Sequence, residues 1–421
     1  MIDVRKLSAI EILDSRSRPT LQVFIELADG TRATAGVPSG ASTGSREAVE
    51  LRDGDPARYS GQGVLKAAGN VNGELADLLQ GRSWSTLADV DQAMIELDGT
   101  DNKARLGANA IVGVSMAVAR AMAAAEGTPL FAWLPDVGRP ARAPVPNFNI
   151  LNGGAHARNP LDFQEFMLSP LGAPSMAEAI RAGSEIYSAL KARLAAAGQP
   201  VGLGDEGGFA PDIAEPEDVL AEIVAAIEAA GYTPGRNGVA IALDPAASEF
   251  RQPDGRYQVN GVLLSSADMI ERYVAMVERF PIWSIEDGVG EDDDSGWKAM
   301  TERLGERIQL VGDDNFCTNP AIVTQAIADG IANASLIKLN QIGSVTETLE
   351  TMRICNQAGY SQMVSHRSGE TPDPFIADLT VGSGCGQLKT GAPARGERVA
   401  KYNRLIEIAS ETPELPYGLP T

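Results

Sequence analysis

The sequence predicts an α/β protein in which a (β/α)8-type barrel follows a smaller N-terminal α+β domain. Short apolar runs alternate with helical patterns over most of the second part of the chain, and an ionisable residue directly follows five of these runs. The length of 421 residues also exceeds what one hydrophobic core usually holds. An open sheet is less favoured, because no Gly-x-Gly-x-x-Gly turn follows an early strand.

The N-terminal part of the chain predicts a hairpin and then helices. Residues 21–27 alternate in polarity, and a tight turn leads into residues 31–37, which is typical of a β-hairpin. Helical patterns follow over residues 64–80, 86–97 and 108–126. The proline-rich segment 135–146 indicates a linker. We therefore predict an α+β domain over 1–134 and a barrel over 135–421.

The barrel pattern begins irregularly. Residues 145–151 predict a strand, and two helices over 175–198 and 216–230 lie close together, the first with a Ser175/Glu178 capping box. Five strands with ionisable ends include 238–243 before Asp244, 280–285 before Glu286, 308–312 before Asp313, 334–337 before Lys338 and 362–365 before His366. Because the C-terminal strand ends of a parallel barrel converge on one mouth, these side chains are expected to form an active site.

Composition excludes several classes of function. The net charge of -21 argues against a nucleic-acid binder or an anionic-membrane binder. Three cysteines without paired spacing predict neither disulfides nor a zinc site. The start of the chain lacks the pattern of a signal segment, and the long uncharged runs are broken before the length of about 20 residues that spans a bilayer. We expect a cytoplasmic protein without a membrane span.

Three carboxylates are candidate metal ligands. Asp244, Glu286 and Asp313 are 42 and 27 residues apart, which suits three consecutive barrel strands that face one point. Hard carboxylate oxygens without cysteine or histidine at neighbouring strand ends suit Mg²⁺. One acidic residue at a strand end is more often solvated or a cap, but three in one register favour a metal site.

Two lysines lie in apolar surroundings near strand ends. Lys338 is either a structural partner of a carboxylate or a general base. Bound cations and a second amine, which Lys389 could supply, are expected to lower the pKa of Lys338 toward the range of a base.

The remaining polar candidates suit a phosphorylated substrate. The only two histidines, His156 and His366, lie in Gly- and Ser-rich segments, where each is either a packed residue or a functional one. Arg367 and Ser368 could bind a phosphate together.

Two glutamates and one glycine-rich loop complete the set of candidates. Of two close carboxyls, such as Glu165 and Glu206, one can stay protonated and donate to a leaving hydroxyl. The loop 38–44 lacks the ending of a P-loop, so it is either a mobile lid that delivers a serine oxygen or a plain hairpin exit.

Nine motifs, taken in order, resemble those of the enolase family. They are SGASTG at 39–44, LNGG at 151–154, QEF at 164–166, GDEGG at 204–208, SIED at 284–287, GDD at 312–314, KLNQIG at 338–343, SHRSGET at 365–371 and KTGAPAR at 389–395. Each is weak alone, but together they are highly specific and cover nearly the whole chain.

This resemblance implies the reversible Mg²⁺-dependent dehydration of 2-phospho-D-glycerate, a small phosphorylated three-carbon acid, to phosphoenolpyruvate. It implies that Asp244, Glu286 and Asp313 hold one Mg²⁺, and that Ser42 in the lid reaches a second, which arrives with the substrate. It also implies that Lys338 removes the C2 proton. The other roles that it implies are an acid (Glu206, supported by Glu165), a partner of the substrate carboxylate (Lys389), and contacts to the phosphate, the leaving group or other parts of the substrate (His156, Gln164, His366, Arg367 and Ser368).

The resemblance further implies a barrel that begins β-β-α-α, a cap domain, and a homodimer that can stack into an octamer. Some positions depart from the family: Ser17 and Arg18 replace the usual Gly and Asn, Pro245 replaces a common Cys, and the segment 158–161 is unusual. These changes leave open an enolase-like enzyme that acts on a phosphonate analogue, as in carboxyphosphonoenolpyruvate synthesis. A non-catalytic scaffold is a third alternative, although no assigned catalytic position is altered.

Overall fold

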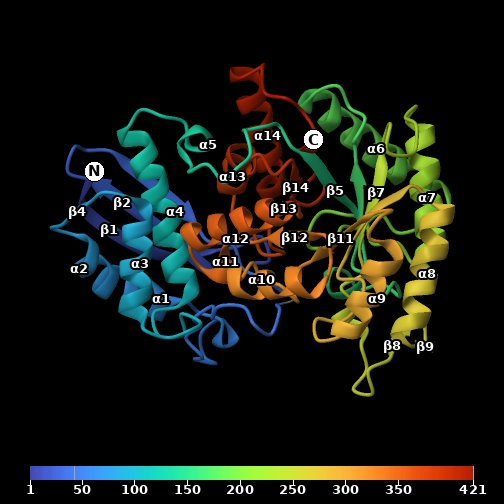
Figure 1. Ribbon diagram of the computed structural model, residues 1–421, viewed down its shortest axis with the longest axis horizontal. Coiled ribbons are helices and arrows are strands. Elements are labelled where there is room, and N and C mark those ends of the chain that lie inside the picture. The colour runs from blue at the N-terminus through green and yellow to red at the C-terminus, as the bar shows by residue number, and fades with distance from the viewer. Residues whose placement is uncertain (42, 421) are drawn as a thin grey trace.

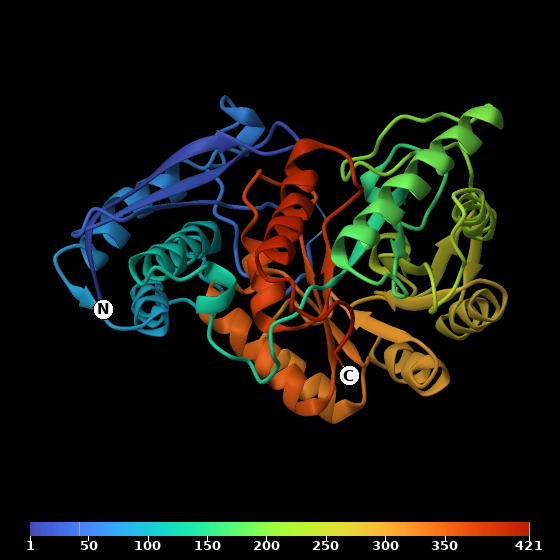
Figure 2. The same cartoon turned by 90° about the horizontal axis from the view of Figure 1, so that it is seen from above.

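The computed structural model describes residues 1–41 and 43–420. Two regions lie side by side, an N-terminal sheet with its helices and a closed barrel (Figures 1 and 2). This arrangement confirms the predicted fold class.

The N-terminal region contains a four-stranded antiparallel sheet in the order β3-β2-β1-β4. The predicted hairpin is present as β2 and β3, whereas the long strand β1 was not predicted. The strands are β1 (Ile2–Leu13), β2 (Pro19–Leu27), β3 (Arg32–Gly36) and β4 (Ser83–Trp84).

Helices cover one face of this sheet. The predicted helix over 64–80 is divided into α1 (Leu65–Asn70), a π-helical turn (Val71–Leu75) and α2 (Ala76–Leu79). Next come α3 (Leu87–Asp98), which a Thr86/Asp89 capping box begins, α4 (Ala108–Ala125) and α5 (Leu130–Trp133).

Helix α4 forms the centre of the N-terminal core. It packs on β2 and β3, and its residues are buried almost all round. Among residues 1–41 and 43–420 it is the one helix long and apolar enough to cross a bilayer, but 83% of it is buried inside the fold. Such burial is typical of a core helix.

The barrel closes in the strand order β10-β11-β12-β13-β14-β5-β6-β7. Strand β6 is antiparallel to both neighbours, and the other pairs are parallel. Its strands are β5 (Val145–Asn152), β6 (Glu165–Ser169), β7 (Ala240–Asp244), β10 (Ile282–Glu286), β11 (Gln309–Gly312), β12 (Ala334–Ile337), β13 (Ser361–Ser365) and β14 (Gln387–Lys389).

The first barrel unit has the expected β-β-α-α order, because α6 (Met176–Ala196) and α7 (Pro216–Ala229) both follow β6. The outer helices that come later are α8 (Ser266–Arg279), α9 (Asp294–Leu304), α10 (Pro320–Asp329), α11 (Leu339–Ile342), α12 (Val345–Ala358), α13 (Phe375–Ser383) and α14 (Gly396–Glu411). A small hairpin of β8 (Tyr257–Val259) and β9 (Val262–Leu264) projects before α8. Short 3₁₀ turns lie at Tyr59–Gly61, Gly154–His156 and Ala247–Phe250.

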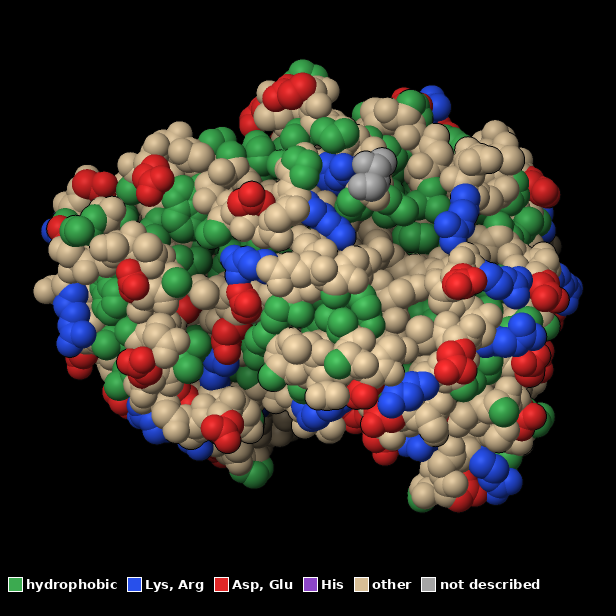
Figure 3. All heavy atoms as spheres, in the orientation of Figure 1, with side chains coloured by type: hydrophobic (Ala, Val, Ile, Leu, Met, Phe, Trp, Pro, Cys, Tyr) green, Lys and Arg blue, Asp and Glu red, His purple; other side chains and the backbone are tan. Residues whose placement is uncertain are grey.

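The N-terminal region contacts the barrel through the segment after β3. Ser39 and Gly369 exchange backbone hydrogen bonds of 2.8 and 2.9 Å, and Ala48 N–H donates to the carbonyl of Gln341 at 2.8 Å. Over the face shown in Figure 3, acidic and basic side chains are interspersed rather than gathered by charge.

Candidate active site

One buried cavity lies at the C-terminal ends of the barrel strands. Its lining holds most of the candidate residues, and Ser365 is the one member that was not predicted: His156, Gln164, Glu165, Glu206, Asp244, Lys338, Ser365, His366, Arg367, Ser368 and Lys389. Asp313 and Glu286 contact lysines of this lining. Ser42, which was predicted to bind metal and substrate, lies outside the described residues.

Strand register brings these groups together. Asp244, Glu286 and Lys389 are the last residues of β7, β10 and β14, while Asp313 and Lys338 directly follow β11 and β12. The strands are buried up to those positions, and the ionisable side chains come where the barrel opens.

Lys389 lies at the centre of a group of carboxylates. Its Nζ is 2.7 Å from Glu286 Oε1, 3.2 Å from Asp244 Oδ2 and 3.3 Å from Glu165. Burial lowers the pKa of Lys389, but the three carboxylates outweigh burial and raise the pKa well above its ordinary value. One amine therefore offsets part of the negative charge of three buried acids.

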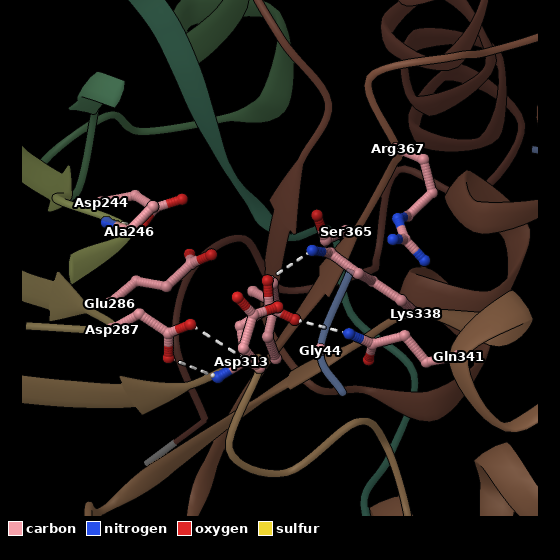
Figure 4. A network of polar contacts seen from close by, with 12 residues as sticks. Gly44, Asp244, Ala246, Glu286, Asp287, Asp313, Lys338, Gln341, Ser365 and Arg367 are labelled. Carbon is pink, nitrogen blue, oxygen red and sulfur yellow. Dashed lines mark hydrogen bonds and ion pairs between the residues drawn. The ribbon is translucent and has the colours of Figure 1, made fainter. Parts of the chain in front are cut away.

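Lys338 is bonded to Asp313 (Figure 4). Its Nζ donates to Asp313 Oδ2 at 2.5 Å, and Gln341 Nε2 donates to the other oxygen at 2.7 Å. Burial lowers the pKa of Lys338, but Asp313 outweighs burial and raises it above the ordinary value. The predicted lowering of this pKa depends on bound cations and stays a prediction; within the protein alone Asp313 has the larger effect and Lys389 the smaller, opposite one.

The chemistry of the predicted ligands Asp244, Glu286 and Asp313 suits a divalent cation, but among the described residues the groups of possible ligands within 4.8 Å of one another include Asp313 and neither of the other two. Asp244, Glu286 and Asp313 are all buried, and Figure 4 shows them on neighbouring strands around one region. Glu286 Oε2 is buried without a hydrogen-bond partner among the described residues. Burial, and then the charge of Asp244, raise the pKa of Glu286 well above its usual range. A cation would satisfy the oxygen and offset the repulsion.

Asp287 is a residue that sequence reasoning did not assign. Its two carboxylate oxygens accept the backbone N–H groups of Asp313 at 2.9 Å and of Asp314 at 3.0 Å (Figure 4). Carboxylate oxygens of Asp287, Asp313 and Asp314 lie within 4.8 Å of one another. Asp287 thus holds the turn that orients Asp313. Its place next to Glu286 in the SIED motif could have pointed to it from the sequence.

A second acidic group lines the same cavity and contacts Lys389 through Glu165. Ligand atoms of His156, Glu165 and Glu206 lie within 4.8 Å of one another. Burial, and then the neighbouring Glu206, raise the pKa of Glu165 well above its usual range. Burial would also raise the pKa of Glu206, but contacts with His366 and His156 and the charge of Arg398 oppose burial and lower this pKa. The two shifts are opposite, so Glu165 is the member of the pair that is more easily protonated.

The phosphate-binding candidates are already paired within the protein. Arg367 makes a bidentate ion pair with Glu47, with distances of 3.0 and 3.1 Å, and also donates to Asn340 Oδ1 at 3.0 Å. Ser368 Oγ accepts from Arg16 Nη1 at 3.0 Å. Sequence reasoning missed Glu47 and Arg16, because their partners are hundreds of residues away.

Two glycines allow the segment after β3 to approach the barrel closely. A Cβ at Gly40 would collide with the guanidinium of Arg367, and a Cβ at Gly44 would collide with Cys317 and the backbone of Asp314. Any residue larger than glycine would push the segment away from the cavity.

Comparisons with known proteins agree with this geometry. The family model described as "Enolase, N-terminal domain" matches residues 4–134, and the one described as "Enolase, C-terminal TIM barrel domain" matches residues 141–416. A curated protein of Rubrobacter xylanophilus, named "Enolase", is 54% identical over 410 residues, which cover 97% of this chain and 95% of that protein.

Proposed function

The chain belongs to the enolase family and is a carbon–oxygen hydro-lyase, and we propose that the barrel mouth carries out the reversible dehydration of 2-phospho-D-glycerate to phosphoenolpyruvate. The observation that supports these roles best is one cavity that two buried lysines and a pair of buried glutamates line together. A base and an acid on opposite sides of a substrate are what removal of a proton and a hydroxyl requires. The relative named Enolase, at 54% identity over nearly the full chain, favours neither the phosphonate analogue nor the scaffold.

We propose that Asp244, Glu286 and Asp313 hold a Mg²⁺ ion. When bound, a divalent cation stabilises the negative charge that develops on the substrate carboxylate as the neighbouring proton leaves. The family resemblance supports a second Mg²⁺ that arrives with substrate and contacts Ser42.

Lys338 is proposed to be the base that removes the C2 proton. To act in this way its amine must first lose a proton, which the contact with Asp313 opposes. Asp313 is also a proposed metal ligand, so a cation there would weaken the contact that raises the pKa of Lys338. Lys389, whose amine stays charged, is proposed to pair with the substrate carboxylate.

Glu206 and Glu165 are proposed to deliver the proton that lets the C3 hydroxyl leave as water. The pair is proposed to retain one proton because two buried carboxyls so close together cannot both ionise readily. We propose that this proton passes to the leaving hydroxyl through Glu206, which the loop 204–208 presents to the cavity.

The phosphate and the rest of the substrate are proposed to contact the other residues of the lining. Arg367 already binds a carboxylate in the bidentate geometry that a phosphate would offer. Binding partners of the substrate are proposed to be Arg367, Ser368, His156, His366, Gln164 and Ser42.

The wider setting also remains a proposal. We propose a cytoplasmic enzyme that forms a homodimer and can stack into an octamer, with an N-terminal cap over 1–134 and a catalytic barrel over 135–421. Family resemblance supports the assembly, and the acidic composition supports an enzyme without a nucleic-acid partner.

The test is an activity assay with purified protein, 2-phosphoglycerate and Mg²⁺, followed by the ultraviolet absorbance of the conjugated product. We expect turnover that EDTA abolishes and that Lys338→Ala reduces strongly. A folded protein that gives no absorbance change, or one indifferent to both treatments, would contradict the proposal.

A further inference from the structure

Arg398 on α14 is fully buried, yet its charge is directed mainly at backbone carbonyls and one imidazole. Its Nη1 donates to the carbonyl of Arg367 at 2.6 Å and to Nδ1 of His366. Its Nη2 donates to the carbonyl of Ser368 at 2.6 Å. The carboxylate of Glu397 approaches only the Nε atom, at 3.4 Å. Burying a cation in this way is costly, so its contact with His366 calls for an explanation.

The contact determines where His366 carries its proton. A guanidinium has five N–H donors and no acceptor, so the Nδ1 atom that it meets must offer a lone pair. Burial lowers the pKa of His366 to about 3, against the opposing charge of Glu206 and with the help of the Arg398 charge, so the ring is neutral near pH 7. A neutral imidazole that accepts at Nδ1 carries its hydrogen on Nε2.

The Nε2 atom of His366 lies next to Glu206 in the cavity. It lies 3.2 Å from Glu206 Oε2, and His366 lines the cavity. Oε2 already accepts from Asn149 at 2.9 Å, and Nε2 is buried without an aligned hydrogen-bond partner among the described residues. An N–H at this point is therefore available to Glu206 and to a group on a bound substrate.

We propose that Arg398 is a positioning residue that holds His366 in the neutral Nε2–H tautomer, so that the site presents an N–H donor to Glu206 and to the leaving hydroxyl. The tautomer follows from contacts within the protein, and only the leaving hydroxyl rests on the proposed function. After Glu206 gives up a proton, its carboxylate would face an N–H. In the other tautomer a lone pair on Nε2 would face the carboxylate and repel it.

Arg395 offers a matched control on the same segment. It donates to the carbonyl of Gly204 at 3.2 Å and to the carbonyl of Ser15 at 2.9 Å, whereas Arg398 reaches the carbonyl of Asp205 at 3.4 Å and the hydroxyl of Ser15 at 3.5 Å. Both arginines thus tie α14 to the same two loops. The ring of His366 distinguishes them, because its Nδ1 atom contacts Arg398.

The experiment reads the tautomer directly by solid-state ¹⁵N NMR of protein labelled with ¹⁵N-histidine. The chain has two histidines, so a His156→Gln variant assigns the signals of His366. We expect a protonated Nε2 and a bare Nδ1 in the wild type and in Arg395→Met. In Arg398→Met a substantial Nδ1–H population should appear, and kcat should fall about 10- to 100-fold with a smaller change in KM. Arg398→Lys, which can only donate, should keep the wild-type tautomer and recover part of kcat.

Other outcomes overturn either the role of Arg398 or the proposed function, and they can be told apart. A wild-type His366 protonated on Nδ1 contradicts the tautomer proposal. Because this measurement needs no variant, it tests the proposal even if Arg398→Met does not fold. An unchanged tautomer in folded Arg398→Met, or the same change in Arg395→Met, would show that Arg398 only ties loops together. A wild type that has the Nε2–H signature but does not turn over 2-phosphoglycerate would contradict the proposed function and leave the tautomer standing.

Discussion

The barrel strands carry two layers of polar side chains, one neutral and one charged. In the deeper layer Gln309 and Gln387 exchange hydrogen bonds of 3.0 and 2.7 Å, and Gln309 also donates to Ser284 at 3.0 Å. Two residues further along β10 and β14 lie Glu286 and Lys389, in the layer of buried charges at the mouth.

The neutral layer stabilises the barrel, whereas the charged layer is arranged to bind a ligand. The neutral layer largely satisfies its own hydrogen bonds, which is what a packed barrel interior needs. In the charged layer one oxygen of Glu286 has no partner among residues 1–41 and 43–420, and three carboxylates share one amine. Such an arrangement costs stability unless a ligand completes it, so we expect activity and stability to respond differently in the two layers.

The largest expected effect is on turnover in the charged layer. Lys338→Ala should lower kcat about 10²- to 10⁴-fold because the proposed base is lost. The thermal unfolding temperature should also fall, because Asp313 loses its buried cationic partner and keeps only the bond from Gln341, so kcat is measured at a temperature at which the variant is folded. The product absorbance assay and a thermal scan measure the two quantities. Near wild-type turnover in this variant would remove Lys338 from the base role.

The neutral layer should respond in stability. Gln309→Leu leaves Gln387 without its buried partner and should lower the free energy of unfolding by about 1–3 kcal/mol. Turnover by the folded protein should remain close to that of the wild type. Urea denaturation and the same assay test this, and the double variant Gln309→Leu/Gln387→Leu should recover part of the loss. A kcat loss comparable to that of Lys338→Ala would contradict the separation of layers.

The unfolding temperature of the metal-free protein should depend on pH because the protein buries carboxyl groups. Burial and Asp313 raise the pKa of Asp314 to about 8. A carboxyl with a raised folded-state pKa contributes stability that is complete below its unfolded value and is lost as pH rises through the folded value. The unfolding temperature should therefore fall as the pH rises from about 4 to about 8.

Asp314→Asn is the control for this pH effect, because an amide cannot ionise. Its unfolding temperature should fall less over the same range, and added Mg²⁺ should stabilise the wild type more at the alkaline end than at the acidic end. A wild-type unfolding temperature that rises with pH in metal-free buffer would contradict the assignment.

The smallest expected effect is at an exposed position of the loop that also carries Ser15 and Arg16. Ser17, in the exposed turn between β1 and β2, has a φ of 60°, a conformation that favours glycine. Ser17→Gly should therefore raise the free energy of unfolding by up to about 1 kcal/mol and leave turnover unchanged. Thr100→Gly, in another exposed loop, serves as the comparison in urea denaturation. Destabilisation of Ser17→Gly would show that the serine makes a contact worth more than the strain.

Much of the barrel and most of the cavity lining could be predicted from sequence. Apolar strands that end on Asp244, Glu286, Asp313 and Lys338 indicated the mouth correctly, because the alternation and length of buried strands are local properties. Strands β6 and β14 escaped prediction, since each is short and ends or begins on polar residues.

By itself the sequence determined which ionisable side chains stand at strand ends, and therefore which groups share the cavity. Tertiary structure alone decided which neighbour each of them meets: Asp313 at Lys338, Glu47 at Arg367 and Arg398 at His366. The reason is physical, because strand register repeats every two residues along the chain, whereas a pKa or a tautomer depends on distances between atoms that the chain does not connect locally.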